Sequence, residues 1–217
     1  MQRRKFFTNT GAVAIGTALL SPGLTLAQTK APVEGADFIE LNRPAPVDAP
    51  AGKIEVVEFF WYNCPHCNAF EPVLSDWVSK LPKDIVFKRV PVAFSSSFEP
   101  QQRLFYALEA LGQLEQLHAR VFAAIHVEKQ NLGQAAAITD WVVKQGIDRA
   151  RFTEQFNSFS ATTKATRARQ MQTDYKVEGV PALGIAGRYY TDGSLAKSMG
   201  RVLQVADYLT DQIRRTR

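Results

Sequence analysis

Cysteine is scarce in this sequence, and internal repeats and low-complexity tracts are missing. The only cysteines are Cys64 and Cys67. A structural zinc site needs a second pair of ligands beside one Cys-x-x-Cys, and the chain has no other cysteine to supply it. With 217 residues, 46% of them hydrophobic and 22% charged, the composition is typical of one soluble globular domain with room for an insertion.

A strong excess of charge is also absent. The formal net charge is +5, but Arg3, Arg4 and Lys5 supply three of those charges and lie in a segment with the features of a leader. The basic residues Arg214 and Arg215 suit a solvated helix end, where the helix dipole favours cations. The charge therefore gives no reason to expect nucleic-acid binding.

The first 27 residues have the pattern of a signal peptide. The basic start is followed by an apolar stretch, Gly11 to Leu20, which is too short to span a membrane. Small residues then precede Gln28 at a spacing that suits signal peptidase. We predict that residues 1–27 are cleaved near Ala27 and that the chain is exported to the periplasm. The Arg3-Arg4 pair resembles a twin-arginine signal, so export by the twin-arginine (Tat) route and export by the general secretory (Sec) route both stay open.

The spacing of the two cysteines indicates reactivity. Export brings the chain into an oxidising compartment, where two cysteines would ordinarily form one structural disulfide. Only two residues separate Cys64 from Cys67, so the closed loop is minimal and a bridge removes little entropy from the unfolded chain. A redox role explains this spacing better than a structural one.

Hydrophobic patterning predicts a strand, a helix and a second strand around the cysteine pair. Residues 54–61 are β-branched and aromatic almost throughout, as in a strand covered on both faces. A helix is expected from Pro65 to Leu81 and a strand from Ile85 to Val92, and this order implies parallel pairing. A further short strand is expected at residues 38–41.

The second half of the chain predicts a helical block followed by a hairpin. From about Pro100 to Ser160, apolar residues recur at helical spacing. We expect Phe152, Phe156 and Phe159 on one further helix of this block. The predicted order ends with a polar helix at 161–175, two strands at 180–186 and 188–190, and an amphipathic helix at 202–213.

The cysteine motif lies where the buried strand meets the helix, and this position explains its chemistry. Cys64 is the predicted N-cap and Pro65 the first helical residue. Free N–H groups and the positive dipole end of a helix stabilise a thiolate at Cys64, which makes the sulfur reactive and a good leaving group. His66 can donate a hydrogen bond to this sulfur or add positive charge beside it. Both effects stabilise the reduced form, so the pair is expected to act as an oxidant.

Cys67 lies one turn further into the helix, where we expect it to be shielded and to form or resolve a mixed disulfide. Glu58 lies within the apolar strand, where an ionised carboxylate is costly unless it has a task or a partner. Our hypothesis is a buried acid near Cys67 that moves protons during exchange. The alternative is an edge position with the carboxylate in water.

Two other features have ordinary explanations when taken alone. Val180-Pro181 opens the late hairpin strand, where a proline cannot serve an interior ladder, and an ordinary turn with a trans peptide bond is the expectation from these two residues alone. His118 and His126 fall near the apolar stripe of one helix, and packing is their expected role.

Taken together, a strand, the Cys64-Pro65-His66-Cys67 tetrapeptide at a helix start and Val180-Pro181 before a hairpin resemble the thioredoxin superfamily, and within it the DsbA family of periplasmic oxidases. The resemblance covers nearly the whole mature chain. It implies an α/β thioredoxin fold with an inserted all-helical domain. The implied limits are 28–97 and 161–217 for the two parts of the thioredoxin-like domain and 98–160 for the helical insertion.

The resemblance also implies a role for each site residue. Cys64 would be the attacking and substrate-linked sulfur, Cys67 the buried partner and Glu58 the buried acid. Pro181 would be a cis-proline facing the disulfide, and Val180 and Pro181 together would bind substrate. The redox-active Cys64–Cys67 disulfide would be the only redox group, without a cofactor or metal.

Partners follow from the same resemblance. Substrates would be unfolded secreted or periplasmic polypeptides, the reoxidant a DsbB-like membrane quinone reductase, and the protein a monomer. A periplasmic disulfide reductase or isomerase is an alternative, although isomerases of this superfamily usually add an N-terminal dimerisation domain, for which the arm at 28–50 is too short. A metal-binding chaperone that uses Cys64, His66 and Cys67 is a second alternative, and it predicts stoichiometric metal after purification.

Overall fold

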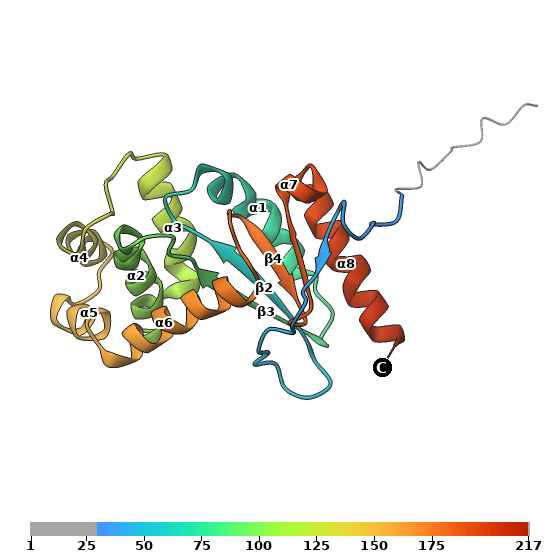
Figure 1. Ribbon diagram of the computed structural model, residues 1–217. Coiled ribbons are helices and arrows are strands. Elements are labelled where there is room, and N and C mark those ends of the chain that lie inside the picture. Colours follow the sequence, from blue (N-terminus) through green and yellow to red (C-terminus); the bar gives the residue numbers. More distant parts are fainter. Residues whose placement is uncertain (1–29, 217) are drawn as a thin grey trace, which may run out of the picture. The chain divides into compact units, whose positions relative to one another are not determined.

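A five-stranded mixed sheet lies at the centre of the fold (Figure 1). The computed structural model describes residues 30–216, so the predicted signal peptide and its cleavage site lie outside the described residues. The strands are ordered β1-β5-β4-β2-β3 across the sheet. Their bounds are β1 Ile39–Glu40, β2 Ile54–Phe60, β3 Ile85–Pro91, β4 Ala182–Ile185 and β5 Tyr189–Asp192.

The apolar sequence of β2 explains its central position. All seven of its residues are buried, and it pairs in parallel with β3 and antiparallel with β4. β4 and β5 form an antiparallel hairpin, and β1 adds to β5 at the edge. The predicted parallel unit, the late hairpin and the short early strand are therefore confirmed.

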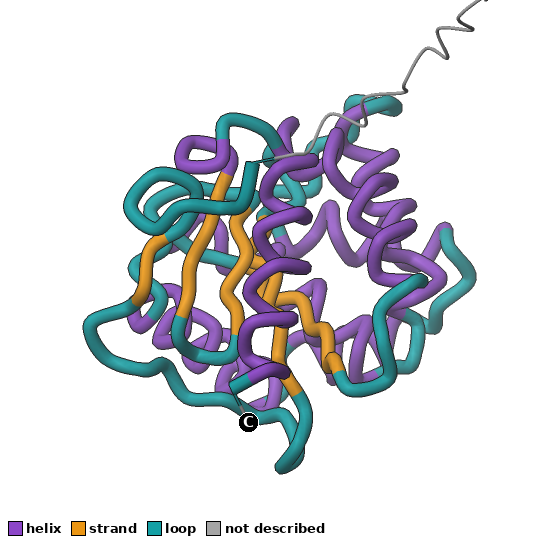
Figure 2. Tube along the Cα trace, turned by 90° about the vertical axis from the view of Figure 1, so that its right-hand side faces the viewer, coloured by secondary structure: helices purple, strands orange, loops and turns teal. Residues whose placement is uncertain are grey.

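Helices cover both faces of the sheet (Figure 2). α1 (Pro65–Ser79) and α8 (Met199–Arg215) enclose one apolar core, which includes Val56 and Leu183 of the sheet. Helices between β3 and β4 enclose a larger core that includes Val57 and Phe59. These helices are α2 (Glu99–Ala110), α3 (Leu114–His126), α4 (Ala135–Lys144), α5 (Arg149–Phe156) and α6 (Phe159–Asp174). Two short helices, η1 (Ser96–Phe98) and α7 (Gly193–Ala196), complete the set for residues 30–216.

This order of elements is that of a thioredoxin fold with helices inserted between β3 and β4, as the resemblance implied. The described part of the chain forms one compact unit from Ala31 onward. The domain limits at 97/98 and 160/161 stay a prediction. Within the described range, every helix is too short or too polar to cross a membrane.

The prediction for Phe159 was wrong. Phe152 and Phe156 lie in α5 and are buried, but α5 ends at Phe156, and Phe159 starts α6 with 86% of its surface exposed. The reason is a helix cap. The Ser158 hydroxyl accepts a hydrogen bond from the Ala161 N–H at 3.0 Å, so a new helix begins before Phe159 can extend the apolar stripe of α5.

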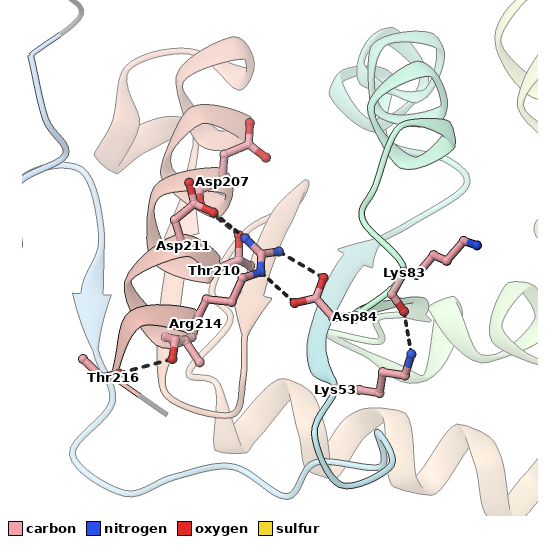
Figure 3. Close-up of polar contacts among 9 residues, drawn as sticks. Lys53, Lys83, Asp84, Asp207, Thr210, Asp211, Arg214 and Thr216 are labelled. Carbon is pink, nitrogen blue, oxygen red and sulfur yellow. Dashed lines mark hydrogen bonds and ion pairs between the residues drawn. The ribbon is translucent and has the colours of Figure 1, made fainter.

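Polar contacts fasten the C-terminal end of α8 beside the sheet (Figure 3). The Arg214 guanidinium donates from Nε to Asp84 Oδ2 at 2.7 Å and also contacts Asp211, one turn earlier in α8. On the neighbouring strand-entry loops, Lys53 Nζ donates to the Lys83 carbonyl at 2.6 Å. The basic residue that the sequence places at the helix end therefore ties α8 to the segment that enters β3.

Candidate active site

Cys64 is the N-cap residue of α1, directly after the loop that leaves β2. Its backbone is extended, with φ −85° and ψ 118°, and Pro65 is the first helical residue. The Cys64 N–H donates to the Trp61 carbonyl at 3.1 Å, which closes a tight turn, and the Cys64 carbonyl accepts from the Asn68 N–H at 3.1 Å, which starts the helix. The predicted position of the motif is confirmed.

The two sulfurs differ in access. Cys64 is 8% exposed and Cys67 is fully buried, and both are free thiols in this structure. Pro65 and His66 are exposed beside Cys64. A partner molecule can therefore approach the Cys64 side of the pair, whereas Cys67 is shielded, as the sequence predicts.

The Cys64 environment favours a thiolate. A hydrogen bond from the Cys67 thiol is the largest cause that lowers the pKa of Cys64, and it outweighs burial, which acts in the opposite direction. The backbone N–H groups of Cys67 and His66 and the charge of His66 add to it, so that the pKa of Cys64 is about 6. Burial raises the pKa of Cys67, which keeps that thiol protonated.

The Val180–Pro181 segment lies beside Cys64. Its peptide bond is cis, the isomer that the resemblance implied. The Cys64 thiol donates to the Val180 carbonyl oxygen at 3.4 Å. Next to it, an open pocket of about 430 Å³ is lined by His66, by Gly179 to Pro181, and by residues of α7 and the start of α8.

Glu58 is 1% exposed in the middle of β2, which is paired on both sides, so the edge-position alternative is wrong. Its Oε2 lies 3.1 Å from Nε of Arg89, in β3. Burial raises the pKa of Glu58 to about 8, although Arg89 acts in the opposite direction. A carboxyl group that holds its proton at neutral pH is suited to proton transfer. That task of Glu58 stays a prediction.

Arg89 and Glu71 belong to the same buried group and were missed in the sequence. Arg89 Nη2 donates to Glu71 Oε1 at 2.8 Å, and the Ser75 hydroxyl donates to the same oxygen at 2.7 Å. Burial raises the pKa of Glu71, but contacts with His118, Arg89 and Ser75 outweigh it and keep the pKa below its usual value. One sequence signal pointed towards Arg89: it lies in the strand that is predicted to pair in parallel with the strand of Glu58, and the register places the two residues opposite each other.

His118 and His126 have more than the predicted packing role. His118 is buried among aromatic rings, which confirms packing. Its ring nitrogens also face Tyr62 and Glu71, and His126 contacts Tyr62 as well. Nothing in the sequence spacing alone connects these residues to the cysteine motif.

The cysteine motif contains three possible metal ligands, Cys64, His66 and Cys67. Among residues 30–216, no three His, Cys, Asp or Glu side chains are grouped in a way that could hold a metal ion.

The chain matches known proteins over most of its length. The family model of the DSBA-like thioredoxin domain matches residues 55–204. The chain belongs to the DsbA family. It is 43% identical over 194 residues to the thiol:disulfide interchange protein DsbA of Burkholderia cepacia, which covers 89% of this chain and 92% of the relative. It is 41% identical to the DsbA of Bordetella pertussis over 217 residues, or 99% and 100% of the two chains.

Solved structures agree with this membership of the DsbA family. The crystal structure of Pseudomonas aeruginosa DsbA superposes with a TM-score of 0.80 at 38% identity, covering 84% of this chain and 94% of that one. The DsbA of Xylella fastidiosa gives a TM-score of 0.78 at 31% identity, covering 85% and 98%. The chain is therefore a thiol:disulfide oxidoreductase with the thioredoxin fold and helical insertion of this family.

Proposed function

We propose that the chain works as an oxidase, which donates the Cys64–Cys67 disulfide to reduced polypeptides. The observation that carries this proposal is the position of Cys64 at the start of α1, beside the Cys67 thiol and His66, where its pKa is lowered to about 6. A stabilised thiolate stabilises the reduced enzyme relative to the disulfide, so the pair tends to give its disulfide away. Low cysteine pKa values and oxidising potentials are already known for DsbA proteins.

Exchange proceeds in two substitutions at sulfur. A substrate thiolate attacks Cys64 of the disulfide, forming a substrate–Cys64 bond and releasing Cys67, which takes up a proton. A second substrate thiolate then attacks the substrate sulfur of this mixed disulfide and releases Cys64 as a thiolate. The substrate loses two electrons and gains one disulfide, and the enzyme becomes a dithiol. The low pKa of Cys64 makes it a good leaving group in the second step.

Neighbouring residues assist these steps. Pro65 starts α1 and thereby sets Cys64 at the N-cap, while His66 adds positive charge near the sulfur. Cys67 needs a proton when it leaves, because its pKa is raised by burial. We assign the supply of that proton to Glu58, which is protonated below about pH 8 and whose charge, once the proton has left, raises the pKa of Cys67.

Substrate binds, in this proposal, along Val180 and Pro181. Two observations support it: the Val180 carbonyl lies 3.4 Å from the Cys64 sulfur, and the open pocket begins at the same residues. An extended polypeptide that follows this edge brings a cysteine side chain to Cys64. Unfolded exported proteins fit, because they offer extended backbone and free thiols.

The setting of the reaction is also part of the proposal. We expect residues 1–27 to direct export to the periplasm and to be removed near Ala27. A DsbB-like membrane quinone reductase would restore the disulfide after each turnover, and the enzyme would act as a monomer. Family membership and the leader-like sequence support these statements.

The test is equilibration of the purified protein with glutathione at varied ratios of reduced and oxidised form, followed by trapping and counting of free thiols. We expect the Cys64–Cys67 pair to be largely reduced at ratios at which typical structural disulfides remain intact. The wild type should also oxidise a reduced, unfolded protein. A strongly reducing potential of the Cys64–Cys67 pair would reject the oxidase direction and favour the reductase alternative.

A matched pair of variants tests the roles of the two sulfurs. Cys67→Ser lacks the resolving thiol, so it should accumulate mixed disulfides through Cys64 in the exported fraction. Cys64→Ser should accumulate none, because Cys67 is fully buried. Adducts through Cys67, or metal bound in stoichiometric amount to the wild type, would contradict the assignment.

A further inference from the structure

Tyr62 lies in the loop between β2 and α1, two residues before Cys64, yet it is only 1% exposed. It belongs to the turn that the Cys64 N–H closes on the Trp61 carbonyl. A shift of Tyr62 would therefore move Cys64 relative to the start of α1. The sequence gives no reason for a buried tyrosine in this loop, and its partners explain it.

Helix α3 of the insertion contacts Tyr62 at two polar groups, the side-chain hydroxyl and the backbone carbonyl oxygen. The Tyr62 hydroxyl lies 2.8 Å from Nδ1 of His118, and Nε2 of His126 lies 2.8 Å from the Tyr62 carbonyl oxygen. Both histidines belong to α3, and His126 follows His118 by eight positions, which is about 12 Å along a helix. The rings of Phe60 and Phe122 pack on Tyr62, whose contact with His118 is buried and whose contact with His126 is partly buried.

The direction of these hydrogen bonds follows from the chemistry of the partners. A carbonyl oxygen only accepts, so His126 Nε2 carries a proton and donates. The other ring nitrogen of His118, Nε2, faces Glu71 Oε2 at 3.4 Å, and this places its proton on Nε2. In the neutral ring Nδ1 is then an acceptor for the Tyr62 hydroxyl. A protonated His118 would leave the buried Tyr62 hydroxyl hydrogen without an acceptor.

The charged groups around His118 agree with a neutral ring. Burial is the main cause that lowers the pKa of His118, and Arg89 of β3 acts in the same direction. Glu71 of α1 and Glu115 of α3 act in the opposite direction. His118 therefore joins the loop before Cys64, through Tyr62, to the helix after Cys64, through Glu71.

We propose that His118 and His126 are positioning residues for thiol exchange, which hold Tyr62 and thereby fix Cys64 against the first turn of α1. The effect of a helix start on an anion falls off within one turn, so a small displacement of the sulfur weakens it. This inference assigns to α3 a task in the reaction itself. It rests on the proposed role of Cys64 as the substrate-linked sulfur.

The readout is the apparent pKa of Cys64, measured by thiolate absorbance in the reduced protein, together with the rate of exchange with glutathione. Tyr62→Phe removes only the hydroxyl, and we expect it to raise the pKa of Cys64 by about half a unit to one unit. Tyr175→Phe is the matched control. It removes another buried hydroxyl, which is bonded to the Gly187 N–H at the far end of β4 from Pro181, and should leave the pKa of Cys64 unchanged.

Variants of the histidines separate their contacts. His118→Asn places an amide oxygen near the Nδ1 position and should stay closer to the wild type than His118→Gln, whose amide lies near the Nε2 position. His126→Gln keeps a donor for the Tyr62 carbonyl, whereas His126→Leu removes it and should raise the pKa of Cys64 as Tyr62→Phe does. If Tyr62→Phe does not fold, the pKa of Cys64 in His126→Leu tests the inference in its place.

An unchanged pKa of Cys64 in Tyr62→Phe or, where that variant does not fold, in His126→Leu would overturn the inference. An equal rise in Tyr175→Phe would also overturn it, because a general loss of stability would then be the cause. Failure of the proposed function looks different: the wild type itself would not exchange disulfides through Cys64.

Discussion

The Cys64 thiol donates a hydrogen bond to the Val180 carbonyl oxygen across 3.4 Å. This contact requires the proton on sulfur, because a thiolate and a carbonyl oxygen repel each other. Val180 thus favours the thiol form, while the Cys67 thiol, the helix start and His66 favour the thiolate. Burial also favours the thiol, but the pKa of Cys64, at about 6, lies below its ordinary value of 9.0, so the groups that favour the thiolate outweigh burial. Four expected outcomes follow from this balance and from the buried charges next to it.

The first concerns the Cys67 thiol, the largest single influence on Cys64. Cys67→Ala removes the donor, and we expect the pKa of Cys64 to rise clearly above 6. Cys67→Ser keeps a hydroxyl donor at the same place and should remain near the wild type. Thiolate absorbance or the pH dependence of alkylation measures both. Equal pKa values in the two variants would show that the hydrogen bond is not the cause.

The second concerns the stability of the reduced protein against pH. The pKa of Cys64 in the folded state, about 6, is below its ordinary value of 9.0. The folded dithiol therefore gains stability as the pH rises from 6 towards 9 and loses it as the pH falls through 6. Denaturant unfolding of the reduced and the oxidised protein should show a difference in free energy that shifts in favour of the reduced form over this range. Reduced Cys64→Ala, which has no thiol at this position, should lack the gain in stability that the reduced wild type shows over this range.

The third concerns Glu58, whose pKa is raised from 4.5 to about 8 in the folded state. Between these values the unfolded state loses the proton and the folded state keeps it, so the free energy of unfolding falls as the pH rises. Glu58→Gln has no such proton and should become more stable relative to the wild type with rising pH, by on the order of 1–3 kcal/mol. Chemical denaturation at pH 4.5, 6 and 8 measures this trend.

The exposed Glu154, in α5, provides the control for Glu58. Glu154→Gln removes the same charge and should show no comparable dependence on pH. The exchange rate of Glu58→Gln separates stability from catalysis. If its pH dependence equals that of the wild type, the proposed proton transfer by Glu58 is rejected.

The fourth concerns Arg89, which contacts both Glu58 and Glu71. Arg89→Leu leaves the ionised carboxylate of Glu71, which is buried here, without its cation and should reduce the free energy of unfolding at neutral pH by about 3–5 kcal/mol. Because Glu71 can be protonated at low pH, the loss should shrink as the pH falls. A second change, Glu71→Gln, should restore part of it. A loss that is the same at every pH would point to packing of the arginine side chain instead.

Much of the fold could be predicted because its signals are local. The β-branched run of β2, the helical spacing after Cys64 and the Pro65 start each lie within a few residues. The same holds for the position of Cys64 at the helix start, and for the shielding of Cys67 one turn later. The error at Phe159 is local as well, since the spacing of three phenylalanines outweighed the capping signal of Ser158.

The polar surroundings of the site could not be predicted in the same way. Arg89, Glu71 and His118 lie on three different elements, and only the folded chain brings them together. Polar residues within helices and strands have no periodic pattern that reveals a buried partner. His118 illustrates this, because its place on an apolar stripe was correctly interpreted as packing, while its two polar contacts are with Tyr62, 56 residues away, and with Glu71 of α1.

The larger hydrophobic core joins the sheet and the inserted helices without a break, from Val57 and Phe59 of β2 to the inner sides of α2 through α6. The inserted helices therefore cannot be replaced by other helices without changes in the thioredoxin-like part of the chain. A different set of helices on this scaffold would need a different inner face on β2, the strand that leads into the cysteine motif. Substitutions at the inner side of the inserted helices and at the inner face of β2 therefore have to match each other.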